Sequence, residues 1–305
     1  MSQFEQEKQP GMNVFIIGFG DIGCRVARLC RQQGYDVGAI SRQPGKCSQE
    51  VTAVTADLDD PDSLRDLPLQ EKVLFYFAPP PVSGCSDSRM TNLVAALNRQ
   101  PDQQPKKVVL ISTTAVYGDC GGQWIDETAI VQPQTARGQR RLDAEQQMLR
   151  WTQQYAIPLV ILRVGGIYGP KRLPLDRLRQ GLPILLESQS PYTNRIHEDD
   201  LAAICLAAAQ QNVSGYFNVS DGHPGTMSRY FKDIARAMDL APPPEVNMDT
   251  AREVMSAGML SYLQESRRLN NTKLLQELDI ELRYPNFEQG LKACVAELAT
   301  QWDKS

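Results

Sequence analysis

The sequence has few of the residues that mark a metal site or a disulfide framework. It contains only two histidines, His197 and His223, and seven cysteines, an odd number of which no two are spaced as CxxC. These features argue against a zinc site and against paired cysteines, and they fit a reducing compartment. We therefore expect no bound metal.

Long apolar runs and clusters of positive charge are also missing. No stretch approaches the roughly 20 apolar residues that span a bilayer, and residues 1–11 contain no apolar run typical of a signal peptide. The net charge is −4, and the basic residues are scattered. Nucleic acids and anionic membranes attract clustered positive charge, so neither is an expected partner. We expect a cytoplasmic protein whose partner is a small molecule.

The chain does contain enough apolar residues for a large core. Its 305 residues are 42% hydrophobic, which allows one large α/β unit or two domains. Short apolar runs alternate with helical patterns through the first two thirds, which predicts βαβ units and a parallel sheet. The expected strands lie near 14–17, 36–40, 51–55, 73–77, 108–112 and 159–164, and the expected helices near 22–33, 61–66, 89–98 and 138–155.

After Gly169 this alternation ends, and proline and glycine become frequent. A helix near 199–211 and a late strand at 216–219 return to the sheet, and the remaining tail predicts short helices. The fold class is therefore α/β, with a Rossmann-type doubly wound parallel sheet and a smaller C-terminal substrate-binding domain. We assign residues 12–169 and 199–240 to the sheet domain, and residues 170–198 and 241–305 to the smaller part.

A glycine-rich turn follows the first expected strand. Gly18, Gly20 and Gly23 form the pattern GxGxxG between an apolar strand and an amphipathic helix, the context that a dinucleotide site requires. The first glycine permits the tight turn, the second lets the backbone approach a pyrophosphate, and the third lets helix and strand pack closely. Asp21 and Ile22 begin the helix whose N-terminus would face the anion. The alternative is a glycine-rich turn in an unrelated α/β protein.

The end of the second expected strand bears on the choice of cofactor. A carboxylate at this place binds the 2′-hydroxyl of NAD, but residues 37–49 contain no acidic side chain. They contain Ser41, Arg42 and Lys46, and a guanidinium can bind a 2′-phosphate in a bidentate manner. The sequence therefore favours NADP over NAD. The alternative interpretation is that Arg42 is a solvated loop residue.

Two further segments follow the third and fourth expected strands. Asp57 and Leu58 would meet the adenine edge, and Ala78 and Pro79 would line the path of the pyrophosphate and the nicotinamide ribose. These places are expected because ligands lie outside the carboxyl ends of parallel strands.

Several motifs then give the chain a family resemblance. It resembles the extended short-chain dehydrogenase/reductases, the NAD-dependent epimerase/dehydratase family, whose members mostly act on nucleotide sugars. The resemblance spans roughly residues 12–222 and implies an NAD(P)-binding oxidoreductase or epimerase. Besides the glycine turn, the matching segments are ISTTAVYG at 111–118, DE at 126–127, LRVGGIYGP at 162–170, RIHEDDL at 195–201 and YFNV at 216–219.

The catalytic YxxxK pair of that family is missing. Pro133, Gly138 and the Ala-Glu pair at 144–145 keep the register, which places Arg137 at the position of the tyrosine and Arg141 at that of the lysine. A guanidinium stays protonated near neutral pH, so Arg137 cannot serve as the acid/base. Arg141 keeps a positive charge, and it is expected to bond a ribose or phosphate oxygen of the cofactor.

The resemblance implies other candidates for catalysis. Thr113 matches a family residue that hydrogen-bonds a substrate oxygen, although its hydroxyl could instead satisfy the backbone at the strand end. Tyr117 is the obvious substitute acid, but the matching tyrosine usually packs beside the substrate region. His197 titrates near neutral pH, yet the matching family histidine typically organises a loop. A water molecule is the third candidate for the proton donor, beside Tyr117 and His197.

The resemblance also suggests residues for the substrate and a dimer interface. Thr114, His197 and Arg267 are the expected substrate-binding residues. Arg267 or Arg268 would pair with an anionic substrate, or alternatively would hold the two domains together. Family members often dimerise through the helices that correspond to 89–98 and 138–155, so a homodimer is expected.

Three functions remain open from the sequence. The chain is an NADP-linked enzyme with a non-standard proton donor, a non-catalytic NADP(H)-binding regulator or sensor, or a structural partner that binds no nucleotide. Fold alone does not choose among them. Cofactor titration separates the third function from the first two.

Overall fold

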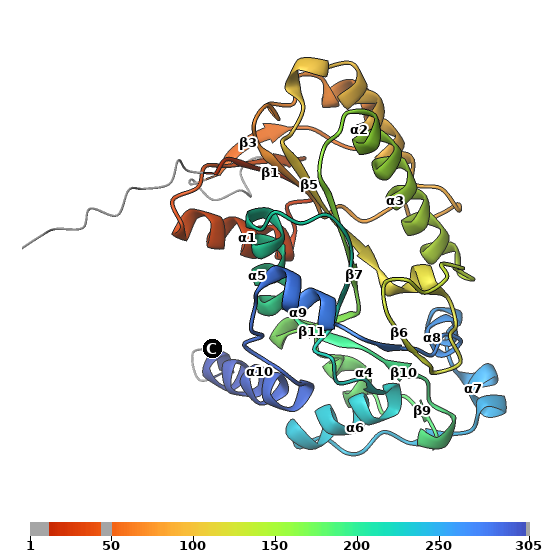
Figure 1. The fold of residues 1–305 in the computed structure, drawn as a ribbon. Helices are drawn as coiled ribbons and strands as arrows, with labels where there is room; N and C mark the ends of the chain where they lie inside the picture. Colours follow the sequence, from red (N-terminus) through yellow and green to blue (C-terminus); the bar gives the residue numbers. More distant parts are fainter. Residues whose placement is uncertain (1–11, 44–50, 303–305) are drawn as a thin grey trace, which may run out of the picture.

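The computed structural model describes residues 12–43 and 51–302, and a seven-stranded parallel sheet forms its centre. Figure 1 shows this sheet between two layers of helices. The strand order is β12-β7-β5-β4-β1-β2-β3, so the order reverses between β1 and β4. The strands are β1 (Val14–Ile17), β2 (Val37–Ser41), β3 (Thr52–Thr55), β4 (Val73–Tyr76), β5 (Lys107–Thr113), β7 (Leu159–Val164) and β12 (Gly215–Val219).

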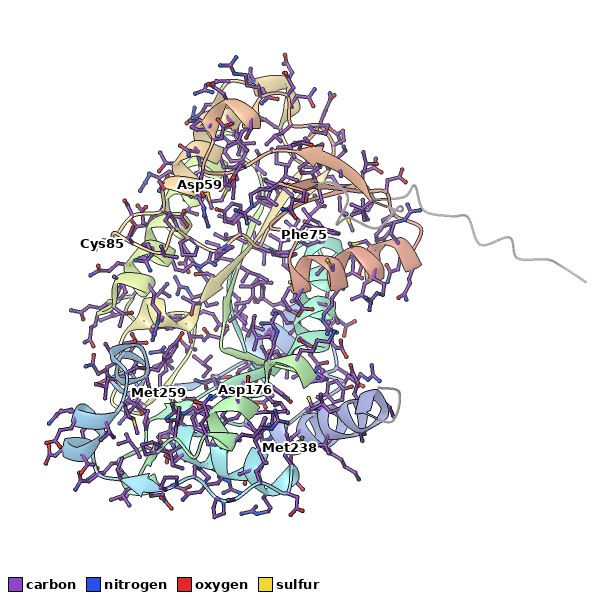
Figure 2. The ribbon with its side chains drawn as sticks, turned by 180° about the vertical axis from the view of Figure 1, so that it is seen from behind. Asp59, Phe75, Cys85, Asp176, Met238 and Met259 are labelled. Carbon is purple, nitrogen blue, oxygen red and sulfur yellow. The ribbon has the colours of Figure 1, made fainter. Side chains whose placement is uncertain are left out.

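Both faces of the sheet are buried, which explains the continuous apolar runs of the strands. On β1, Val14 and Ile16 pack toward one helical layer, and Phe15 and Ile17 pack toward the other. Figure 2 shows the buried side chain of Phe75 inside this arrangement. One layer contains α1 (Asp21–Gln32), α5 (Glu198–Gln210) and α9 (Thr272–Leu278), and the other contains α2 (Ser88–Asn98) and α3 (Ala136–Gln154). The predicted α/β fold is confirmed.

One expected helix is much shorter than predicted. The pattern at 61–66 predicts a helix, but the chain forms only a one-turn 3₁₀ helix, η2 (Pro61–Leu64). Asp60 caps this turn, because its side chain accepts a hydrogen bond from Asp62 N at 3.1 Å. Asp66 has a φ of 62°, a left-handed conformation that ends any helix. The capping signal was therefore present, but the chain turns away after one turn.

A smaller part packs below the carboxyl ends of the strands. Its own core includes Tyr168, Leu178, Phe231, Leu291 and Cys294. Its helices are α4 (Leu175–Arg179), α6 (Met227–Ala237), α7 (Met248–Val254), α8 (Ala257–Leu263) and α10 (Phe287–Trp302).

Short strand pairs and 3₁₀ turns connect these helices with the sheet. The strand pairs are β8 (Gly166–Tyr168) with β11 (Arg195–His197), β9 (Ile184–Leu185) with β14 (Glu245–Val246), β10 (Tyr192–Thr193) with β13 (Gly225–Thr226), and β6 (Trp124–Ile125) with β15 (Arg268–Leu269). The remaining 3₁₀ turns are η3 (Pro101–Gln103), η4 (Thr114–Tyr117), η5 (Pro170–Arg172) and η6 (Glu187–Gln189).

The packing departs from the expected division of the chain at two helices. The division placed α6 with the sheet, but Phe231 and Ile234 of α6 belong to the core of the smaller part. It placed α9 in the smaller part, but Leu274 and Leu278 of α9 pack with the sheet core. Each of these helices has an apolar face, but the local sequence pattern does not specify which of the two cores that face packs against. Within residues 12–43 and 51–302, no helix is long and apolar enough to cross a membrane.

We predict that Gly18→Ala destabilises the fold far more than Gly20→Ala. Gly18 has a φ of 96°, and an added Cβ would lie 2.4 Å from Ala78 N. The strained conformation and the clash together are expected to cost about 3 kcal/mol or more. Gly20 has a φ of −92°, and nothing lies within 4 Å of an added Cβ. Its substitution should cost less than about 1 kcal/mol. Urea unfolding measures both, and equal losses would contradict the prediction.

Candidate cofactor site

The glycine turn after β1 has the geometry that a dinucleotide needs. The chain at Gly18 passes directly against the backbone of Ala78, after β4. At Gly23 an added Cβ would lie 2.7 Å from the carbonyl oxygen of Gly18, so α1 begins close behind the turn. At Gly20 the space above the backbone is open. The N-terminus of α1 therefore faces an accessible region beside a bare backbone, where an anion can approach.

A cavity of about 630 Å³ opens at this edge of the sheet. It lies where the strand order reverses, the usual place for a ligand in an open α/β sheet. The predicted residues that line it are Gly18, Gly20, Ser41, Arg42, Asp57, Leu58, Ala78 and Pro79. The structure thus brings together four segments that the sequence separates. Ile22 and Gly23 are buried behind the turn, and Lys46 lies outside the described residues.

Arg89 also lines the cavity, and sequence reasoning missed it. Its Nε and Nη2 atoms donate to the carboxylate of Asp59 at 2.9 and 2.6 Å, and its Nη1 donates to the carbonyl of Pro79 at 3.0 Å. The hydrogen bond from Arg89 holds the pKa of Asp59 below its usual range. A signal was present in the sequence, because Arg89 lies in the first turn of the helix after the fourth strand. That turn faces the carboxyl edge of the sheet.

Asp21 does not line the cavity. Its carboxylate pairs with Arg172 at 2.8 Å and with Arg25 at 3.4 Å. Burial acts to raise the pKa of Asp21, but the hydrogen bond from Arg172 and the charge of Arg25 outweigh it and lower the pKa. Arg172 also contacts Glu198 at 3.0 Å. The two arginines therefore neutralise a negative charge that would otherwise repel an anion at the N-terminus of α1.

Arg137 connects α3 to the segment around α8. Its Nη1 atom donates to Ser261 Oγ at 3.1 Å, and its Nη2 atom lies 3.5 Å from a carboxylate oxygen of Glu265. Its guanidinium carbon lies 3.7 Å from the ring centre of Tyr262. The residue at the position of the catalytic tyrosine therefore makes structural contacts with the smaller part.

Arg141 is half-buried beside the cofactor cavity. Its Nη1 atom donates to the carbonyl of Ala78 at 3.1 Å, and no ion pair joins it to any carboxylate within the described parts of the chain. Burial lowers the pKa of Arg141. Asp87 lies near it but keeps one buried oxygen without a partner, and burial raises the pKa of that carboxyl group. Arg141 therefore places an uncompensated positive charge against a wall of the cavity.

The structure does not support Tyr117 as a substitute acid. Its hydroxyl donates to Asn218 Oδ1 at 2.8 Å, and both side chains are buried. The guanidinium of Arg163 lies over its ring at 4.9 Å, and burial raises the pKa of the phenol. The phenol therefore has a fixed partner in the interior, and Tyr117 does not line the cavity.

The two threonines before Tyr117 make local contacts. Thr113 Oγ1 accepts a hydrogen bond from Ala115 N at 3.3 Å and caps η4, which is the alternative considered from the sequence. Thr114 is buried within η4. Neither residue lines the cofactor cavity.

His197 is a buried structural residue at the start of α5. Its Nδ1 atom accepts a hydrogen bond from Asp199 N at 3.1 Å, and its Nε2 atom lies 3.6 Å from Cys294 Sγ. Burial lowers the pKa of His197 to about 4 and raises that of Cys294 to about 12. The pair is therefore neutral and cannot act as a thiolate and imidazolium. The expected substrate role of His197 is not supported, because the ring packs between Tyr168 and Tyr284.

Arg267 and Arg268 hold the segment before α9 in place. Arg267 donates to the carbonyl of Gly118 at 2.5 Å and to Glu265 at 2.9 Å, and only 8% of the residue is exposed. Arg268 donates to the carbonyl of Gly122 at 2.7 Å. Because Glu265 neutralises Arg267, the geometry favours the domain-linking alternative over pairing with an anionic substrate.

We predict that His197 remains neutral down to acidic pH. Because its folded-state pKa lies below 6.5, the unfolded chain binds the proton first as the pH falls. The fold should therefore lose up to about 3 kcal/mol between roughly pH 6.5 and pH 4, and regain it as the pH rises. His197→Asn keeps a capping acceptor but removes this titration. The free energies of unfolding of the two proteins should diverge across this range.

The imidazole nitrogen signals in NMR spectra measure the same titration directly. Since the chain contains only one other histidine, a His223→Gln variant assigns the signals. A His197 ring that is protonated at pH 6, or a stability difference that does not change with pH, would contradict the prediction.

Comparisons with known proteins show the family of this chain. A model of the NAD dependent epimerase/dehydratase family matches residues 14–220. A 3-diazoavenalumate denitrifying reductase from Streptomyces sp is 25% identical over 139 residues, which cover 43% of this chain and 45% of that protein. The chain thus aligns with less than half of the length of this relative.

Solved structures of the same fold cover nearly the whole chain. A conserved protein of unknown function from Silicibacter pomeroyi superposes with a TM-score of 0.77 at 27% identity, covering 94% of this chain and 99% of that one. UDP-glucose 4-epimerase from Thermotoga maritima superposes with a TM-score of 0.76 at 19% identity, covering 95% of this chain and 100% of that one. dTDP-glucose 4,6-dehydratase from Bacillus anthracis, in complex with NAD, superposes with a TM-score of 0.73 at 18% identity, covering 96% of this chain and 98% of that one. The chain belongs to the NAD-dependent epimerase/dehydratase family.

Proposed function

We propose that this chain is an NADP-linked oxidoreductase or epimerase that takes its proton from a non-standard donor. The observation that carries the proposal is the cofactor cavity. It combines an open glycine turn, the guanidinium of Arg42 at the end of β2, and the half-buried charge of Arg141 beside Ala78. These features suit a dinucleotide with an additional phosphate.

The preference for NADP rests on the charges at one end of the cavity. No carboxylate follows β2 directly, and Arg42 is exposed at the cavity wall. The carboxylate of Asp59 is already paired with Arg89. A 2′-phosphate there would meet a guanidinium that makes bidentate bonds, without a facing unpaired carboxylate on β2. The Bacillus anthracis dehydratase, which has a similar fold, was solved with NAD. The proposed preference for NADP therefore rests on the residues of this chain and not on the fold.

The proton donor is a water molecule in this proposal. A bound nicotinamide supplies or accepts a hydride. The phenol of Tyr117 and the imidazole of His197 are both buried with fixed partners, and Arg137 is tied to Glu265. Among the described residues that line the cavity, the ionisable side chains are Arg42, Asp57 and Arg89. Asp57 follows β3, where the adenine is expected, so in this proposal water reaching the open cavity supplies the proton, and Arg141 would hold the nicotinamide ribose.

The substrate in this proposal is a nucleotide sugar or a similar small molecule. The Thermotoga maritima epimerase and the Bacillus anthracis dehydratase are named for nucleotide sugars. The Streptomyces relative is named as a reductase. The residues around this cavity are compatible with a reduction whose proton does not come from a tyrosine.

A non-catalytic NADP(H)-binding regulator is the second candidate. The contacts of Arg137 favour it, because the place of the catalytic tyrosine is engaged by Ser261, Tyr262 and Glu265. This candidate binds NADP(H) without hydride exchange on any nucleotide sugar. Absorbance at 340 nm, followed with a panel of nucleotide sugars, separates it from the enzyme.

We also propose a homodimer through α2 and α3. The two helices pack side by side over one face of the sheet, and the proposal rests on the family resemblance. Light scattering of the purified protein tests it, and a monomer at micromolar concentration would contradict it.

We predict that NADPH binds more tightly than NADH and that Arg42 provides the difference. Loss of its charge-assisted hydrogen bonds in Arg42→Gln should weaken NADPH binding about 10- to 100-fold and leave NADH binding nearly unchanged. Arg28→Gln is the matched control, because Arg28 is exposed on α1 and does not line the cavity. Fluorescence titration measures all four affinities. Tighter NADH binding by the unaltered protein would overturn the assignment of NADP.

We predict a different signature for Arg141. Arg141→Leu should weaken NADPH and NADH alike, by about tenfold or more, because Arg141 bonds Ala78, where the pyrophosphate and nicotinamide ribose that both cofactors share are expected. Arg141→Lys keeps the charge and should retain most of the affinity. Isothermal titration calorimetry measures both variants. An Arg141→Leu variant that binds as tightly as the unaltered protein would show that Arg141 does not contact the cofactor.

A further inference from the structure

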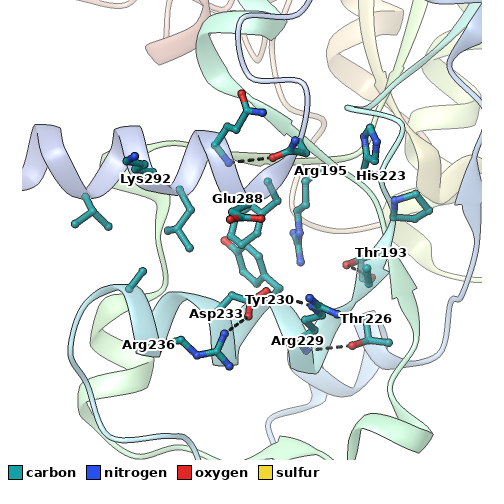
Figure 3. Close-up of a pocket in the computed structure, with 18 residues that line it drawn as sticks. Thr193, Arg195, His223, Thr226, Arg229, Tyr230, Asp233, Arg236, Glu288 and Lys292 are labelled. Carbon is teal, nitrogen blue, oxygen red and sulfur yellow. Dashed lines mark hydrogen bonds and ion pairs between the residues drawn. The ribbon is translucent and has the colours of Figure 1, made fainter.

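A second cavity, of about 1010 Å³, lies in the smaller part between α6 and α10. Figure 3 shows the side chains that line it. They come from the end of β10, from β11, from the loop at 223–226 and from the two helices. None of them lines the cofactor cavity, so the two cavities are built from separate residues.

Arg195 extends into this cavity without a counter-ion (Figure 3). Its Nε atom is buried and has no hydrogen-bond partner, and no carboxylate of the described chain lies within 4.0 Å of its guanidinium. The guanidinium carbon lies 3.8 Å from the ring centre of Tyr230. On its other side an added Cβ at Gly166 would meet Nη1 at 2.2 Å, so the bare backbone of Gly166 makes room for the charge.

No ion pair joins Arg195 to the other charged residues that line the cavity in the described chain, Glu288 and Lys292 included. Arg229 and Arg236 both pair with Asp233, at 3.5 and 3.3 Å. Asp221 packs nearby, but its Oδ1 atom accepts a hydrogen bond from His223 N and its Oδ2 atom is buried without a partner. The carboxylate of Asp221 therefore influences Arg195 only through space.

A partly buried cation without a carboxylate partner costs stability, because its hydration is reduced and no ion pair replaces it. Burial indeed lowers the pKa of Arg195. Such a cost is commonly found where a residue serves a ligand. The position of the guanidinium is also fixed between Tyr230 and Gly166, which reduces the entropy that binding would cost.

One stretch of the remaining wall is apolar, and Glu288 and Lys292 of α10 lie beside it. Tyr230 and Phe287 lie with ring centres 5.0 Å apart, and Leu291 and Val295 of α10 continue the same wall. The planar guanidinium can bind a carboxylate in a bidentate manner, and the aromatic and aliphatic wall beside it suits an apolar body. We propose that this cavity is a second binding site, which takes a small monocarboxylate with an aromatic or branched apolar body and pairs its carboxylate with Arg195.

The test uses benzoate as the probe and NMR chemical-shift titration as the measurement. Benzoate should bind with a Kd of about 1 mM or tighter, with shifts at α6 and α10. Benzamide has the same ring without the charge, and inorganic phosphate has the charge without the ring. Both should bind at least about tenfold more weakly. Equal binding of benzamide or phosphate, or no benzoate binding, would overturn the proposal.

Two variants compare arginines of the same cavity. Arg195→Leu should weaken benzoate binding about tenfold or more. Arg236→Leu should have little effect, because Arg236 is 81% exposed at its side chain and is paired with Asp233. If Arg195→Leu does not fold, Arg195→Lys keeps the charge without the planar fork and should still weaken binding several-fold. Benzoate binding that is unchanged in the folded Arg195 variant would also overturn the proposal.

The proposal is independent of the cofactor assignment. NADPH titration of the Arg195 variants should give the affinity of the unaltered protein, since Arg195 does not line the cofactor cavity. Loss of NADPH binding in these variants would show a general disturbance of the fold and would remove the support for a separate site.

Discussion

The close approach of the backbone at Gly18 and Ala78 is the constraint on which the cofactor cavity depends. The two residues follow the neighbouring parallel strands β1 and β4, and a side chain on Gly18 would collide with Ala78. Because Gly18 has none, the chain turns into α1 directly beside the end of β4. Ala78 also accepts the hydrogen bond from Arg141. The same few backbone atoms therefore place the open helix N-terminus and a half-buried cation at one cavity.

Three arginines, one buried and two half-buried, show how differently the fold treats the same side chain. Arg163 is paired with Glu145 at 2.8 Å, and Ser112 donates to the same carboxylate. The two charges of that pair neutralise each other, so neither requires a ligand as counter-ion. Arg141 and Arg195 have no such partner in the described chain, and each borders a cavity. The energetic difference between a paired and an unpaired buried charge is several kcal/mol. The unpaired arginines are therefore the ones whose charge remains available.

The sequence contained most of the fold because the fold depends on local patterns. Alternating apolar runs specify the strands, and the glycine spacing specifies the first turn. The cofactor-side residues were also predictable, because parallel strands bring their carboxyl ends to one edge. Contacts between distant residues were not. Arg89 with Asp59, and Arg137 with Glu265, depend on how the connecting loops lie. No local sequence pattern predicts the course of these loops. The close approach of Arg195 to Gly166 could not be predicted for the same reason.

The guanidinium of Arg137 determines what the start of α3 can do. A phenol can transfer a proton, whereas a guanidinium offers several donors and a permanent charge. Arg137 uses these donors on Ser261 and Glu265, and Glu265 also binds Arg267. On the opposite side of the molecule, Arg172 links the smaller part to Asp21 at the start of α1.

Separating the smaller part from the sheet would therefore break ion pairs at both helix N-termini. These are the two helix ends that border the cofactor region, since α1 follows the glycine turn and α3 carries Arg141. A charge that enters the cofactor cavity interacts electrostatically with the N-termini of α1 and α3, which these ion pairs also contact. The contacts of Arg137 and Arg172 thus join the smaller part to the two helix ends beside the cofactor cavity.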